Sequence, residues 1–89
     1  MRQSLGHSLV CSPNPADHVF RLLFEMPLRA ETEWILFDQN GIQRLTGWVR
    51  KNEEELMINV AHLPAGVYFI QLFHDRYLWK PRRFIIIHH

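Results

Sequence analysis

Apolar and polar residues alternate along most of this chain at the spacing of β-strands. Over residues 19–25, Phe20, Leu22 and Phe24 fall on one face, whereas Arg21 and Glu25 fall on the other. An alternation of this kind places one face against a core and leaves the other in water. The same pattern predicts further strands over residues 42–49, 56–60, 67–73 and 77–87.

The segment 32–38 differs, because it is apolar on both faces. Trp34 and Leu36 share one face, and Ile35 and Phe37 share the other. A strand of this composition is usually central in its sheet and covered on both sides. We therefore expect a central strand here.

Glycine and proline mark the turns and irregular positions between these strands. Gln39-Asn40-Gly41 predicts a hairpin turn, because Asn-Gly accepts the positive φ that tight turns need. Gly47 suggests a bulge or bend within the returning strand, and Pro81 predicts an edge position or a bulge in the last one. The two prolines of Ser12-Pro13-Asn14-Pro15 predict a stiff, extended opening segment.

The stretch Leu63-Pro64-Ala65-Gly66-Val67-Tyr68 resembles the tyrosine corner of Greek-key sandwiches. In that motif the tyrosine hydroxyl bonds back to upstream backbone and holds the crossover between strands. The chain has 89 residues, turn signals every 8–15 residues and no segment with helical periodicity. We predict one all-β domain, an immunoglobulin-like β-sandwich of six to seven mainly antiparallel strands.

Composition narrows the possible functions. The chain is 47% hydrophobic, too apolar for a disordered segment, and its formal net charge is only +1, which argues against a nucleic-acid partner. The basic and aromatic stretch 76–84 could track a nucleic-acid backbone, but charges on an edge strand explain it better. No apolar run approaches the length of a membrane span, so no membrane insertion is expected. Residues 1–10 lack the apolar stretch of a signal peptide, so an exported parent chain would carry its signal elsewhere.

No arrangement of catalytic residues emerges from the sequence. Gly-x-Ser-x-Gly is absent, and Cys11 has His7 and His18 nearby in sequence but no evident orienting group. We interpret Cys11 as a small residue in or beside a strand. No His-x-x-x-His pair exists and Glu53–Glu55 suits a solvated turn, so we predict no metal, no cofactor and no enzymatic activity.

Four motifs follow one another in a specific order. They are Ser12–Ala16, Ile35–Gly41, Ile58–Tyr68, and the pair Arg82-Arg83 before Phe84-Ile85-Ile86. Each is ordinary turn or strand chemistry by itself. Together they resemble the type A C-terminal sorting domain of the type IX secretion system. The resemblance covers residues 12–87 and rests on the motif positions Pro13, Asn14, Pro15, Asp38, Gly41, Leu63, Gly66 and Tyr68.

Three departures from the family pattern are conservative. Phe37 stands where the family often has tyrosine, Asn59 where it usually has aspartate, and Arg82-Arg83 where it often has lysines. With the domain at 12–87, we interpret residues 1–11 as a lead-in or linker remnant. Residues 88–89 are then the chain end or the remnant of a tag.

The resemblance implies a route for a parent protein. The domain would be continuous with an N-terminal cargo domain and direct it through the periplasm and the outer-membrane translocon of a Gram-negative bacterium. A sortase-type cysteine protease would then remove the domain by a cut before Pro13, leaving the cargo at the cell surface or in the medium. We expect Lys80, Arg82 and Arg83 to form part of the surface that the translocon recognises.

One alternative function stays open from the sequence. An immunoglobulin-like accessory module of a secreted protein could bind carbohydrate or protein, with Trp48 and Trp79 as an exposed platform. The three tryptophans, including Trp34, are more than the family pattern leads us to expect. They form either part of the core or a patch that faces a partner.

Overall fold

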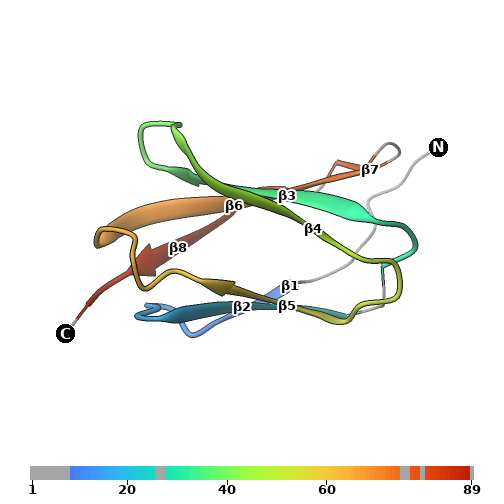
Figure 1. Cartoon of the computed structure of the whole chain (residues 1–89), viewed down its shortest axis with the longest axis horizontal. Helices are drawn as coiled ribbons and strands as arrows, with labels where there is room; N and C mark the ends of the chain where they lie inside the picture. Colours follow the sequence, from blue (N-terminus) through green and yellow to red (C-terminus); the bar gives the residue numbers. More distant parts are fainter. Residues whose placement is uncertain (1–8, 26–27, 75–76, 79, 89) are drawn as a thin grey trace.

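Two antiparallel β-sheets packed face to face make up the protein (Figure 1). The computed structural model describes residues 9–25, 28–74, 77–78 and 80–88. One sheet has the order β1 (Leu9–Ser12), β2 (Val19–Phe24), β5 (Glu55–Asn59). The other has the order β4 (Gln43–Val49), β3 (Thr32–Asp38), β6 (Gly66–His74), with β7 (Tyr77–Leu78) and β8 (Arg82–Ile86) both paired to β6. The predicted all-β, immunoglobulin-like sandwich is confirmed.

The described residues form eight strands, whereas the sequence predicted six to seven. One addition is β1, which pairs with β2 from Leu9↔Phe24 to Ser12↔Arg21 and was not predicted as a strand. The other arises because the predicted strand 77–87 is divided into β7 and β8. Pro81 lies between them, and proline cannot donate a hydrogen bond to a neighbouring strand.

The core lies between the two sheets and follows the alternation seen in the sequence. Phe20 and Leu22 of β2 are fully buried, as are Phe84 and Ile86 of β8. The rings of Phe20 and Phe84 stack with centroids 3.7 Å apart, which joins the two sheets at their centre. Burying one such side chain contributes about 1.5–3 kcal/mol, a large share of the stability of a small domain.

The prediction of a bulge or bend at Gly47 is wrong, and the structure gives this glycine another role. Gly47 pairs in register with Trp34, and the irregularity of this strand pair lies between Leu36 and Phe37. A Cβ added to Gly47 would come within 2.8–3.0 Å of the Trp34 indole. The glycine therefore makes room for a buried tryptophan, which is a matter of packing and not of backbone shape.

β3 is an interior strand of its sheet, in agreement with the predicted central position, with β4 on one side and β6 on the other. Its inward residues Trp34 and Leu36 are buried in the core. The outward residues Ile35 and Phe37 are only half-buried. In the described part of the chain no element packs over that outer face, so the expectation of cover on both sides is met on one side only (Figure 1).

Candidate recognition surface

The Pro13-Asn14-Pro15 motif connects the opening of the domain to its last strand. The three residues bend instead of extending, and the chain then reaches Ala16, which bridges to Ile86 of β8 in the other sheet before β2 begins. The Asn14 Oδ1 atom accepts a hydrogen bond of 3.1 Å from the Ile85 backbone N–H. Ala16 donates to the Ile85 carbonyl at 2.8 Å and accepts from the Ile87 N–H at 2.9 Å. The motif thus closes the domain across 71 positions of sequence.

The Asp38 to Gly41 motif forms the hairpin between β3 and β4. One carboxylate oxygen of Asp38 accepts the backbone N–H groups of Asn40 and Ile42, at 2.9 and 3.0 Å. The other oxygen lies 3.5 Å from the Arg44 guanidinium. Gly41 has φ of +81°, a conformation that glycine adopts without strain. Asp38 therefore holds the backbone of the turn in place.

The third motif holds the crossover before β6. The Tyr68 hydroxyl donates to the Pro64 carbonyl at 2.6 Å, the bond that a tyrosine corner requires. Burial raises the pKa of this phenol. Gly66 has φ of +157°, a positive value that residues with a side chain rarely adopt, so glycine is favoured at this turn. Upstream, the Asn59 side-chain oxygen accepts the Ala61 N–H at 2.9 Å, as the aspartate usual at that position also could.

The three basic residues proposed for recognition do not form one cluster. Lys80 is exposed and lies before β8. Arg82 and Arg83 are consecutive in β8, so their side chains leave opposite faces of the sheet. Arg82 lies on the same face of β8 as the buried Phe84, and it interacts electrostatically with the Cys11 thiol of β1. Arg83 is on the outer face, opposite Phe69 of β6.

Cys11 lies within β1, the location suggested by the sequence, and is half-buried. Burial raises the pKa of its thiol, and the lowering effect of Arg82 is the smaller of the two. A raised pKa keeps the thiol protonated at neutral pH. Cys11 therefore lacks the character of a nucleophile in this environment.

His88 ties the end of the chain to the crossover loops. Its Nδ1 atom lies 2.8 Å from the Asp17 carboxylate, and its Nε2 atom lies 2.6 Å from the Leu63 carbonyl. Both partners are acceptors, so the two hydrogen bonds form together only when both ring nitrogens carry a proton, as in the imidazolium cation. The hydrogen bond to Asp17 is the main cause that raises the pKa of His88. His89 lies outside the described residues.

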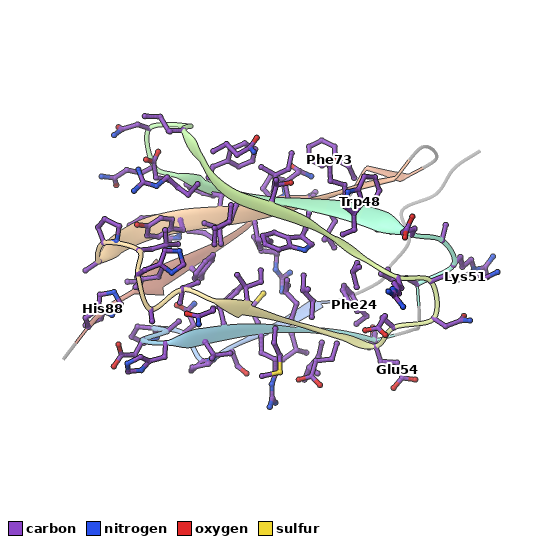
Figure 2. All side chains as sticks on the ribbon, in the orientation of Figure 1. Phe24, Trp48, Lys51, Glu54, Phe73 and His88 are labelled. Atoms are coloured by element: carbon purple, nitrogen blue, oxygen red, sulfur yellow. The ribbon has the colours of Figure 1, made fainter. Side chains whose placement is uncertain are left out.

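The tryptophans have different locations. Trp34 is part of the core, whereas Trp48 is 61% exposed on the outer side of the five-stranded sheet. Figure 2 shows Trp48 and Phe73 on that outer side, while Phe24 points between the sheets. Trp79 lies outside the described residues, so the proposed platform of Trp48 and Trp79 stays a prediction.

Within the described residues, no group of three histidine, cysteine, aspartate or glutamate side chains could hold a metal ion. None of the described segments forms a helix long and apolar enough to cross a membrane.

Comparison with known proteins identifies the family. The family model for the secretion system C-terminal sorting domain matches residues 12–87, nearly the whole chain. The comparison with curated proteins gives no match. Because the family model spans the four motifs and both sheets, this chain belongs to the family of type IX secretion C-terminal sorting domains.

Proposed function

We propose that this domain directs an N-terminal cargo protein through the outer-membrane translocon of the type IX system and is removed afterwards. Membership of the family makes the domain a type IX sorting signal, which implies export to the cell surface or beyond in a Gram-negative bacterium. The family is one of signals and not of catalysts. The passage through a translocon, the removal by a sortase-type cysteine protease and the fate of the cargo are our proposals.

The proposal is supported by how the polar groups of the motifs are bonded in the structure. Three of them engage their polar groups in turns and closures inside the domain: Asn14 with Ile85, Asp38 with its hairpin, and Tyr68 with Pro64. These motifs therefore stabilise the folded domain, which acts as the sorting signal. Recognition must then come from exposed side chains, and Lys80, Arg82 and Arg83 are all exposed.

The position of the proposed cut can be narrowed. A cut immediately before Pro13 would remove β1, which contributes four register pairs with β2. Proteases seldom cleave where the backbone is hydrogen-bonded within a strand. We therefore place the cut N-terminal to Leu9, which leaves the sandwich intact and extends the domain beyond residues 12–87.

An export assay tests the function. Residues 1–89 are fused to the C-terminus of a folded periplasmic reporter in a cell with a working type IX system. The reporter should appear at the surface or in the medium. A fusion that stays wholly in the periplasm while its sorting domain is folded would contradict the proposal.

The basic residues are tested in the same assay. Replacement of Lys80, Arg82 and Arg83 together by glutamine should leave the melting temperature nearly unchanged, because exposed charges contribute little to stability. Export should fall, since the charge complementarity with the translocon is lost. Unchanged export would show that these residues are only a solvated edge.

A further inference from the structure

The outer face of the five-stranded sheet is unusually apolar for a surface in water. Strand alternation sends every second side chain of β3, β4, β6 and β8 away from the core. Phe37, Phe69 and Arg83 form one row across the sheet, and Trp48, Glu33 and Phe73 form another. We call this surface the outer apolar face; its apolar members are Ile35, Phe37, Trp48, Phe69, Phe73 and Ile85.

The opposite sheet shows what an ordinary solvated face looks like in the same protein. Its outward side chains include Arg21 and Glu55, joined by an ion pair of 2.8 Å. Met57 and Val10 are exposed there, by 58% and 54%; Met57 lies opposite Arg21, and Val10 lies opposite Leu23, which pairs in turn with Glu55. The outer apolar face instead carries aromatic side chains in two rows, and Ile35 lies between them in a row with Thr46 and Gln71. Apolar residues that gather on one sheet face mark a contact site more often than single exposed ones do.

Sequence and structure disagree at the centre of this face. β3 has the composition of a strand covered on both sides, but the described part of the chain covers only its inner side. Ile35 and Phe37 thus resemble core residues whose second layer is supplied by another molecule. Trp48 and Phe73 flank Glu33 and are 61% and 36% exposed.

The charged groups on this face constrain the covering molecule. The Thr46 hydroxyl donates to the Trp34 carbonyl at 2.9 Å and lies 3.4 Å from the Glu33 carboxylate. Arg83 is exposed beside Phe69 and makes no ion pair among the described residues. A partner with an apolar centre and a carboxylate opposite Arg83 would complement the face.

The size of the face argues for a partner of another kind and not for a second copy. Its three most exposed apolar members, Trp48, Phe73 and Ile85, together expose on the order of 300 Å², taking roughly 150–250 Å² for each whole side chain. A stable interface buries about 800 Å² on each partner. The smaller area suits a contact that forms and is released, as an export signal needs.

We propose that the outer apolar face is the surface by which a protein of the export apparatus holds this domain, through an apolar patch that carries a carboxylate opposite Arg83. This inference rests on the proposed sorting function and names the part of the domain that is read. Of the three basic residues, it assigns the contact to Arg83 in particular.

The test uses paired substitutions in the export assay. Trp48→Thr with Phe73→Thr removes two aromatic contacts from the outer apolar face, while threonine keeps a good strand former at each position. Met57→Thr with Val10→Thr is the matched control, because it removes exposed apolar side chains from the other sheet. The first pair should lower the exported fraction about tenfold, since aromatic anchors dominate such contacts. The control should export as the unmodified domain does.

Charge reversal gives a second, independent variant that leaves the apolar side chains in place. Arg83→Glu should reduce export strongly, whereas Arg29→Glu, at an exposed position outside the strands, should not. Thermal melts of all variants establish that the domain remains folded. The inference is overturned if the exported fraction is the same for the two apolar pairs. It is likewise overturned if the exported fraction is the same for Arg83→Glu and Arg29→Glu.

Two further outcomes are separable from these. If the unmodified fusion is not exported, the sorting function itself fails, whatever the variants do. If the unmodified domain sediments as a dimer and Trp48→Thr with Phe73→Thr makes it monomeric, the face belongs to a second copy and the proposed partner is wrong.

Discussion

The contact between Gly47 and Trp34 offers the sharpest test of the core. Gly47 of β4 lies opposite Trp34 of β3, and the indole occupies the space where a Cβ would stand. An ideal Cβ would be 2.8 Å from Cζ2, 2.9 Å from Cε2 and 3.0 Å from Nε1 of that ring. Trp34 is only 9% exposed, so its rigid ring cannot move away without disturbing the core. We expect Gly47→Ala to destabilise the domain.

The magnitude follows from two opposing effects. Overpacking a core commonly costs about 1–3 kcal/mol of unfolding free energy. Alanine in place of glycine within a strand recovers about 0.5–1 kcal/mol, because glycine loses more conformational freedom on folding. The difference spans about 0–2.5 kcal/mol, and because the contacts with the buried ring are at or below 3.0 Å we expect a net loss of about 1–2 kcal/mol. At about 4–8 °C per kcal/mol for a domain of this size, the melting temperature should fall by about 5–15 °C.

Thermal unfolding followed by circular dichroism measures the effect, and a double-mutant cycle assigns its cause. In a Trp34→Phe background the same alanine should cost little or stabilise, because phenylalanine lacks the fused ring that Cβ would meet. An equal cost in both backgrounds would show that the backbone of β4, and not the indole, requires glycine. A Gly47→Ala domain as stable as its parent would refute the packing argument altogether.

Three further predictions concern closure of the domain. Tyr68→Phe should cost about 1 kcal/mol in chemical denaturation, because the Pro64 carbonyl loses its donor; an unchanged midpoint would contradict the tyrosine corner. Phe84→Ala should cost about 3–5 kcal/mol and leave the domain largely unfolded by near-ultraviolet circular dichroism, since this fully buried ring stacks on Phe20; a native spectrum would disprove that role. His88 has a pKa raised in the folded state by its bond to Asp17, so its stabilisation is complete below pH of about 6.5 and is lost as pH rises through the folded-state pKa. The stability difference between the parent and His88→Ala should therefore be larger at pH of about 5.5 than at about 8.5, and a difference independent of pH would exclude the imidazolium.

The strands and turns were predictable because their determinants are local. A period of two in apolar residues, as at Phe20, Leu22 and Phe24, is enough to identify a strand and its buried face. Asn40-Gly41 identifies a tight turn by backbone preference alone. The spacing of such signals led to the sandwich fold, and the order of four motifs led to the family.

The edge strands of the sheets and the roles of single residues were less predictable. β1 has only four residues, too few for a period of two to identify it, although its partner β2 is the next strand along the chain. The role of Gly47 depends on its contact with the Trp34 indole, and the sequence does not show that the two residues lie opposite each other. The separation of Arg82 from Arg83 requires knowing which face of β8 is buried.

The amino-acid sequence by itself determined the class of fold, the turns and the family, since alternation and turn chemistry act over a few residues. Tertiary structure alone decided what each motif does and which surface remains available. It brings Asn14 to Ile85 across 71 positions, joins Tyr68 to Pro64, and leaves the outer side of β3 uncovered although its sequence suits a core. The physical reason is that burial and hydrogen bonding between sheets depend on which strands become neighbours, and local sequence patterns do not encode that pairing.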